Sequence, residues 1–117
     1  MIEKNIALAR FYYEAMDNKD LVSFHKFLHQ DVRLISPFGV TQTKEAVLVS
    51  IQKFFDVFDT LTIDGAFGAG NQTVIIYDVH CPAPIGTIRA ASYMTFKDGL
   101  IETIELLYDT QPFYRTK

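Results

Sequence analysis

Apolar residues recur at spacings of three and four along three segments in the first half of the chain. This spacing predicts a helix over roughly Ile2 to Asp17, and a second helix over about Leu21 to His29 with Asp20 as its N-cap. A third helix begins after a capping Thr43 and runs to about Asp59. The apolar stripe of this third helix consists of Leu48, Ile51, Phe55 and Phe58, with Phe54 beside it.

The hydrophobic period changes to two in the second half, where β-branched and aromatic residues are frequent. This alternation predicts strands near Leu61–Ala66, Thr73–His80, Gly86–Phe96 and Leu100–Tyr108, after an earlier short strand over Asp31–Ile35. The Asp98-Gly99 pair between the last two strands is typical of a tight hairpin. Helices followed by hairpin-linked strands predict an α+β fold with an antiparallel sheet.

Three helices of this size cannot cover both faces of a four- or five-stranded sheet. We therefore expect the sheet to curl around the first helix and bury that helix on several sides. The uncovered outer face and the sheet edges then favour a homodimer.

Composition adds an excess of aromatic rings to this picture. The chain has 117 residues, which suits one domain, and ten Phe and six Tyr but no Trp. A domain of this length buries roughly 65% of its unfolded surface, so it folds without disulfides or a structural metal. Sixteen rings are many for so small a core. We expect some of them to line a pocket or a partner surface.

Charge and targeting signals exclude several classes of protein. The formal net charge is −3, and the 11 Lys and Arg residues are scattered. Nucleic-acid binders cluster such residues, so we expect no nucleic-acid partner. No apolar run approaches the ~20 residues that span a bilayer, and the N-terminus lacks a signal-peptide pattern. We therefore expect a soluble, cytoplasmic protein without a membrane partner, in which the lone Cys81 is structural.

Three stretches carry a resemblance to a known family: AMDNKDL (15–21), LHQDVRLISPFG (28–39), and FKDGLIE (96–102) with LYD (107–109). Over about residues 5–113 the chain resembles the nuclear-transport-factor-2-like superfamily, and within it the SnoaL-like and ketosteroid-isomerase-like group. The resemblance implies one domain over residues 1–117. It also implies a cone-shaped α+β barrel, with three N-terminal helices packed on a curled antiparallel sheet. Such folds enclose an apolar pocket with one mouth, but the fold does not determine the function.

The resemblance also points to candidate ligand-binding residues. Steroid isomerases of this fold place an aspartate base on an Asp-Pro-x-Gly turn, and here Ser36 takes the aspartate position. Tyr12 matches their carbonyl-polarising tyrosine, and Ser92 matches their acidic donor. Only Tyr12 keeps the residue type found at these three positions in the steroid isomerases, so the comparison argues against steroid-isomerase chemistry. It leaves a hydroxyl-lined site for a carbonyl or hydroxyl ligand, unless Tyr12 is an ordinary half-buried aromatic.

Asp78 and His80 are the strongest polar pair outside that set. They lie two apart on one predicted strand, so they share a face and could act as a base and its orienting partner. However, Ile75, Tyr77 and Val79 form the more apolar face of this strand, which favours an outer or interface position for Asp78 and His80.

The remaining polar candidates are weaker. Asp109 ends the last strand and is either a catalytic carboxylate or an anchor at the pocket rim. His25 and His29 have the spacing of metal ligands on a helix but lack an obvious third ligand, so we expect no metal site. No phosphate-binding loop appears, and we expect no cofactor.

We therefore expect a small-molecule-binding domain with an apolar, aromatic-lined pocket for a neutral or weakly polar ring or acyl compound. The expected ligand contacts are Tyr12, Ser36, Phe38, Phe55 and Ser92. One alternative is an isomerase, cyclase or dehydratase that uses Asp78 with His80, or Asp109, as its base. Another is a protein-interaction module that uses the exposed sheet face. The orientation of Asp78 and His80 separates the first two possibilities, and the presence of a cavity tests the third.

Overall fold

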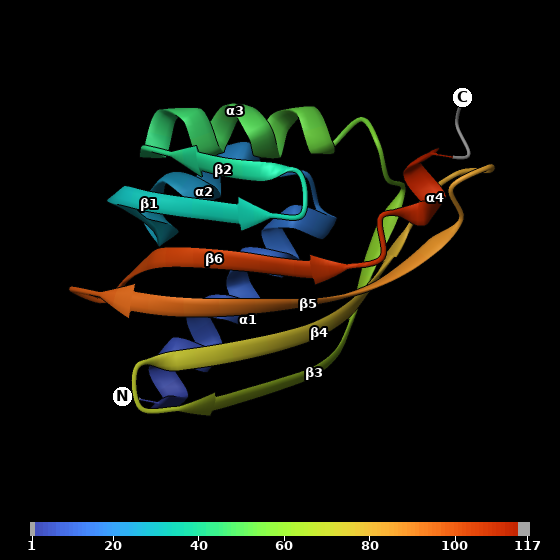
Figure 1. The fold of residues 1–117 in the computed structure, drawn as a ribbon. Helices are drawn as coiled ribbons and strands as arrows, with labels where there is room; N and C mark the ends of the chain where they lie inside the picture. The colour runs from blue at the N-terminus through green and yellow to red at the C-terminus, as the bar shows by residue number, and fades with distance from the viewer. Residues whose placement is uncertain (1, 115–117) are drawn as a thin grey trace.

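Within residues 2–114, which the computed structural model describes, the chain forms four helices and six strands (Figure 1). Their order and bounds are α1 (Ile2–Asp17), α2 (Leu21–Phe27), β1 (Leu28–Ser36), β2 (Gly39–Gln42), α3 (Lys44–Phe54), β3 (Thr60–Ala69), β4 (Gln72–His80), β5 (Thr87–Lys97), β6 (Leu100–Tyr108) and α4 (Gln111–Tyr114). The first helix has the predicted bounds, and β6 does as well.

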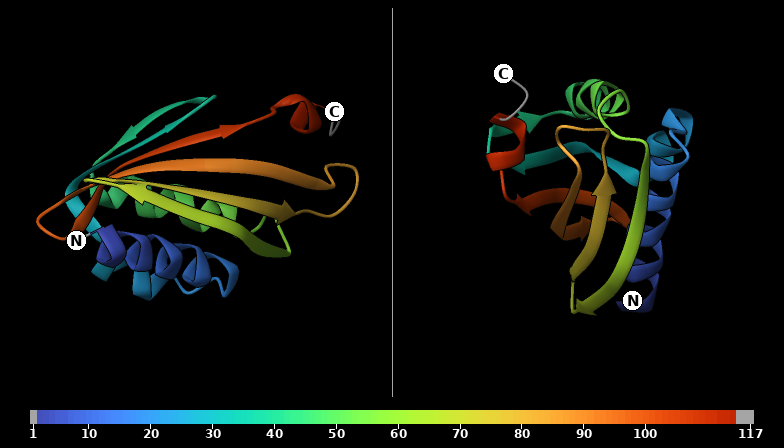
Figure 2. Two further views of the ribbon diagram at one scale, coloured as in Figure 1. Left: turned by 90° about the horizontal axis from the view of Figure 1, so that it is seen from below. Right: turned by 90° about the vertical axis from the view of Figure 1, so that its right-hand side faces the viewer.

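All six strands join one sheet in the order β2-β1-β6-β5-β4-β3. The pairing is antiparallel except between β1 and β6, which run parallel. The sheet is strongly curved, with α1 lying against β3 and β4 and α3 against β1 (Figure 2). The predicted α+β fold with a curled sheet around the first helix is confirmed, and one parallel pair is added to the predicted antiparallel pattern.

The core lies between the concave face of the sheet and the helices. On β4 the buried side chains are Thr73, Ile75, Tyr77 and Val79, which alternate with partly exposed residues as the period of two predicts. Helix α1 contributes five buried side chains to the same core: Ala9, Tyr12, Tyr13, Ala15 and Met16. None of the helices in residues 2–114 combines the length and the apolar character that a membrane crossing needs.

The turns explain where the observed bounds differ from the predicted ones. Helix α3 ends at Phe54 rather than near Asp59, because the N–H groups of Asp56 and Val57 donate to carbonyls only three residues earlier. Helix α2 ends at Phe27, and β1 starts at Leu28 instead of Asp31. Strand β2 was not predicted, because it is only four residues long and mostly exposed.

The hairpin between β5 and β6 forms where the sequence predicted it. Asp98 and Gly99 have φ angles of 55° and 77°, and positive values at both central residues match the twist of the flanking strands. This turn keeps β6 in the centre of the sheet, where its second half forms one wall of the pocket described below.

Candidate functional site

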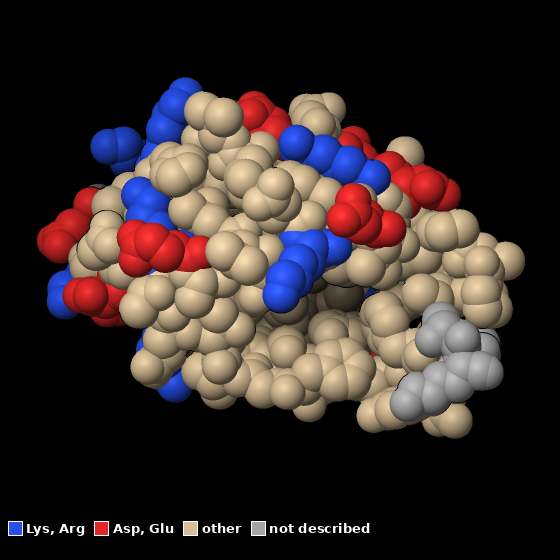
Figure 3. Space-filling view, turned by 90° about the horizontal axis from the view of Figure 1, so that it is seen from above, with Lys and Arg blue, Asp and Glu red and all other residues tan. Residues whose placement is uncertain are grey.

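A pocket of about 380 Å³ lies between α1, α3 and the concave face of the sheet. This volume lies within the range of small-molecule sites. The pocket opens on the side of β2 and α3, where Figure 3 shows a dark hollow to the right of the centre. None of the described residues that line it is acidic or basic. The lining is therefore neutral, and it consists of apolar side chains with phenol and aliphatic hydroxyl groups.

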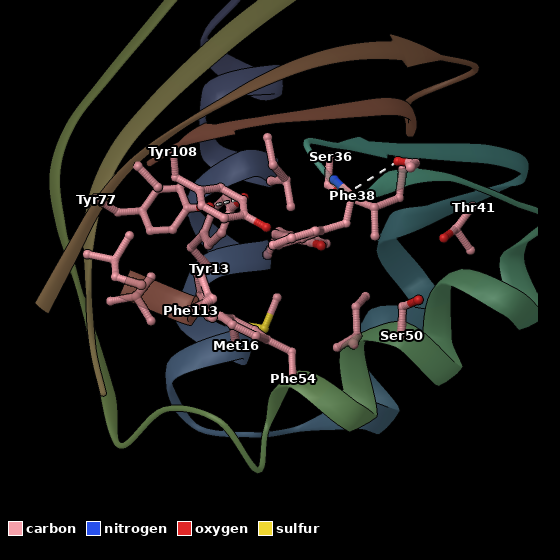
Figure 4. Close-up of a pocket in the computed structure, with 18 of the residues that line it drawn as sticks. Tyr13, Met16, Ser36, Phe38, Thr41, Ser50, Phe54, Tyr77, Tyr108 and Phe113 are labelled. Carbon is pink, nitrogen blue, oxygen red and sulfur yellow. Dashed lines mark hydrogen bonds between the residues drawn. The ribbon is translucent and has the colours of Figure 1, made fainter. Parts of the chain in front are cut away.

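Phenol groups from three elements meet in this pocket. Tyr12 and Tyr13 come from α1, Tyr77 from β4 and Tyr108 from the end of β6. The Tyr13 hydroxyl donates to the Tyr77 hydroxyl oxygen at 3.3 Å, and the two ring centroids are 4.4 Å apart (Figure 4). Burial raises the pKa of each of the three phenols on α1 and β4 above the usual value of 10.0. They therefore stay protonated, and able to donate hydrogen bonds, at neutral pH.

The Tyr12 phenol packs among aromatic rings, but its hydroxyl makes no hydrogen bond with the described part of the chain. Its side chain is only 2% exposed, and it packs edge-on against the rings of Tyr13 and Phe24. Its hydroxyl makes no hydrogen bond with any residue in the range 2–114, although the residue lines the pocket. Within residues 2–114 the side-chain oxygens that are fully buried without a partner are those of Thr73 and Ser92, so the Tyr12 oxygen is open to the cavity. Tyr12 therefore lines the pocket with a free hydroxyl, and its role as a donor to a ligand stays a prediction.

Ser36 and Phe38 also line the pocket, on the turn between β1 and β2. The Ser36 hydroxyl accepts the Phe38 N–H at 3.1 Å and donates to the Gly39 carbonyl at 3.5 Å, so the turn itself uses this group. Phe38 is 58% exposed and contacts the rings of Tyr108 and Phe113 with centroid distances of 6.4 and 6.0 Å. These three rings form an aromatic rim.

The other two predicted contacts do not line the pocket. Phe55 follows the last residue of α3, and its ring packs near Phe24 with a centroid distance of 6.2 Å. Ser92 is fully buried on β5, next to Tyr13 but outside ordinary hydrogen-bond geometry. Burial raises the pKa of Tyr13, and the neighbouring Ser92 hydroxyl opposes this rise. Ser92 therefore lies behind the wall of the pocket.

Asp78 and His80 lie on the outer face of the sheet, opposite the pocket. Their neighbours Tyr77 and Val79 line the pocket, and successive side chains on a strand point to opposite faces. The guanidinium of Arg89 donates to Asp78 at 3.4 Å, and the imidazole of His80 lies between two threonine hydroxyls at 3.0 and 3.2 Å. These contacts hold both side chains away from the cavity.

A bulge in β3 adds a second carboxylate to this outer cluster. The register shifts between Ile63 and Gly65, so Asp64 projects beside Asp78. The Arg89 guanidinium that contacts Asp78 also lies 3.0 Å from the Asp64 carboxylate. The adjacent Asp78 carboxyl, followed by desolvation, raises the pKa of Asp64. The cluster is thus a surface ion-pair group.

Asp109 and the histidines have structural contacts of their own. Asp109 is exposed, does not line the pocket, and accepts the Gln111 N–H at 3.0 Å at the start of α4. His29 lies on β1, so it does not share a helix with His25. Its Nδ1 accepts the Asp31 N–H at 3.0 Å. Across residues 2–114, no group of three His, Cys, Asp or Glu side chains could hold a metal ion.

Sequence reasoning did not select several lining residues, and three of them left a usable signal. Tyr13 and Tyr77 occupy the predicted apolar faces of α1 and β4, where a phenol marks a pocket wall as well as a core. Ser50 interrupts the apolar stripe of α3 between Val47 and Ile51, which is itself a signal of a polar cavity. Thr41 lies on the unpredicted β2, so nothing in the sequence indicated its direction.

Comparisons with known proteins agree with this architecture. A protein from Kribbella flavida DSM 17836 superposes with a TM-score of 0.87 at 21% identity, covering 94% of this chain and 90% of its own. A proposed ketosteroid isomerase from the same organism superposes with a TM-score of 0.84 at 19% identity, covering 92% of this chain and 79% of its own. A proposed SnoaL-like polyketide cyclase from Jannaschia sp. CCS1 superposes with a TM-score of 0.84 at 9% identity, covering 97% of this chain and 90% of its own.

Identities this low show a shared fold and nothing more specific. No curated protein matches the chain. The SnoaL-like domain family, by contrast, matches residues 9–104, which is most of the sequence and includes most of the elements that build the pocket. As its sequence resemblance indicated, the chain belongs to the SnoaL-like domain family.

Proposed function

We propose that this chain binds a neutral, largely apolar small molecule in the pocket between α1, α3 and the sheet. The observation that carries the proposal is the combination of an uncharged lining with the Tyr12 phenol, which lines the pocket and makes no hydrogen bond with any residue in the range 2–114. Removing an ionised ligand from water into a site without opposite charge is costly, so a neutral compound suits this lining. A carbonyl oxygen is a fitting partner for the Tyr12 hydroxyl, because a protonated phenol donates.

The lining favours binding over the isomerase, cyclase or dehydratase alternative. Those reactions move a proton and depend on a positioned acid or base with a suitable pKa. Asp78 and His80 lie on the other face of the sheet, and Asp109 caps the start of α4. A cavity of this size also supports ligand binding over a role confined to protein interaction. A cytoplasmic location stays a prediction from the sequence.

The test compares a neutral ketone with a charged compound of similar shape. We expect 4-phenylcyclohexanone to bind measurably in calorimetry, and 4-phenylcyclohexanecarboxylate to bind at least tenfold more weakly. Tyr12→Phe removes only the phenol oxygen, so it should weaken the ketone by about 1–2 kcal/mol, or roughly 5- to 30-fold. The matched control is Tyr93→Phe, since Tyr93 lies on the outer face and is partly buried.

Two results would contradict the proposal. One is that the carboxylate binds as well as the ketone, which would mean that the site accepts charge. The other is that no member of a panel of neutral cyclic ketones binds while both variants keep the wild-type unfolding temperature.

A further inference from the structure

The pocket has a second group of polar atoms, away from the phenols. Thr41 on β2 and Ser50 on α3 lie together at one side of the pocket, and Tyr13 and Tyr77 lie at the other (Figure 4). Both hydroxyl-bearing residues are partly buried. They come from elements that the chain brings side by side, because β2 leads directly into α3 through the capping Thr43.

Neither of these hydroxyls has a protein partner. Thr41 and Ser50 make no side-chain hydrogen bond with any residue in the range 2–114, whereas the hydroxyl of Ser36 nearby is used by its own turn. Ser50 is also a polar residue on a face of α3 that is otherwise buried and apolar, through Val47 and Ile51. Two residues that line one cavity and carry hydroxyls without a protein partner are a ready pair of donors and acceptors.

Apolar side chains separate the two polar groups. Met16 and Phe54 lie between the phenols and the Thr41–Ser50 pair, and Ile51 adds to the same apolar lining (Figure 4). A ligand that filled the whole pocket would therefore meet polar atoms at both ends and hydrocarbon in the middle.

We propose that Thr41 and Ser50 form a second polar subsite, which holds a hydroxyl or carbonyl group at the far end of the ligand. The ligand class is then an elongated, uncharged compound with an apolar middle and an oxygen function at each end. This inference rests on the proposed function, because it assigns the other oxygen to the phenol end at Tyr12. A ligand that lacks the second oxygen leaves both hydroxyls desolvated and unpaired, which is how a polar subsite discriminates.

The experiment compares compounds that differ by one hydroxyl. The probes are 4-phenylcyclohexanone and its derivatives with a hydroxyl at the para or the meta position of the phenyl ring, which reach different distances. We expect at least one hydroxylated probe to bind wild-type protein roughly three- to tenfold more tightly than the parent ketone. In the double variant Thr41→Val, Ser50→Ala, this ratio should fall to about one, since only the hydroxyls are removed.

Thr95→Val is the matched control, because Thr95 alternates with buried neighbours on β5 and faces outward. It should keep the wild-type ratio, and thermal unfolding should show that all variants fold. An unchanged ratio in the double variant would overturn the subsite. Equal affinities for the parent and both hydroxylated probes in wild-type protein would do the same, while Tyr12-dependent binding of the parent ketone would leave the proposed function standing. Absence of binding by all three probes would contradict both.

Discussion

Tyr12 and Tyr13 are neighbours on α1, yet their hydroxyls have different surroundings. Both side chains are buried because the apolar face of this helix is wide, and their rings pack edge-to-face with centroids 4.8 Å apart. The Tyr13 hydroxyl is bonded to Tyr77, whereas Tyr12 has no partner among the described residues. The Tyr13 phenol therefore stabilises the wall of the pocket, and the Tyr12 phenol is available to a ligand.

The buried phenols predict a loss of stability at alkaline pH. Burial raises the pKa of Tyr12, Tyr13 and Tyr77 above the usual value of 10.0, while the same groups in the unfolded chain ionise near that value. The stabilisation is therefore complete below pH 10 and is lost as the pH rises toward the folded-state pKa. We expect the free energy of unfolding to fall above pH 10 by at most about 1.4 kcal/mol per pH unit for each phenol.

Urea unfolding between pH 8 and 11.5 measures this slope. Tyr77→Phe should make the slope shallower, because one raised pKa is removed, even though the variant also loses the bond to Tyr13. A free energy of unfolding that stays level up to pH 11.5 would show that the phenols ionise in the folded protein as they do in the unfolded chain.

The sequence indicated which elements contribute to the pocket more reliably than it indicated which of their side chains reach the cavity. Tyr12, Ser36 and Phe38 line the cavity, but Ser92 lies one layer behind it and Phe55 lies beyond the end of α3. Resemblance and alternation identify which face of an element points inward. They do not indicate which inward side chains stop at a cavity, because that depends on the curvature of the sheet and the packing of the helices.

At the scale of elements, periodicity predicted the long segments well and the short ones poorly. Strands β4 and β5 alternate cleanly between buried and less buried residues, and α1 has a continuous apolar face. Strand β2 has only four residues. Helix α3 ends where the backbone hydrogen bonds change from a four-residue to a three-residue spacing, although Phe58 continues the apolar spacing. Phe58 is buried after the helix has ended, so its spacing reflects tertiary packing rather than helix continuation.

One side chain connects the end of α1 to the start of β3. The Asp17 Oδ1 accepts the Leu61 N–H at 2.8 Å in a part-buried site. Asp17→Ala leaves this backbone donor unpaired, so we expect a loss of about 1–3 kcal/mol in the free energy of unfolding. Asp17→Asn keeps an oxygen acceptor and should lose less than half as much. Urea denaturation of both variants checks this, and equal losses would show that the hydrogen bond is not the cause.

At the scale of the whole molecule, the outer face of the sheet is more apolar than an exposed face needs to be. Phe67 on β3 is 61% exposed and Leu107 on β6 is 53% exposed. Between them, β4 and β5 present a row of partly buried side chains: Val74, Ile76, Ala91 and Tyr93. The ion pairs of Arg89 with Asp64 and Asp78 border this row on β3, β4 and β5. An apolar row with a charged border is the pattern of a protein-contact surface.

We predict that two copies of the chain associate through this outer face, as the sequence indicated. Light scattering during size-exclusion chromatography should then give twice the protomer mass of 13.3 kDa. Phe67→Glu and Leu107→Glu each place a charge on the contact surface and should shift the mass toward the monomer, because an unpaired buried charge is strongly unfavourable. The matched control is Val22→Glu, since Val22 on α2 is 74% exposed and lies on the helical side of the molecule.

A dimer that survives both sheet variants but dissociates with Val22→Glu would assign the interface to the helices instead. Because the pocket faces the concave side, the sheet variants should keep the wild-type affinity for 4-phenylcyclohexanone, which separates loss of the dimer from loss of the binding site.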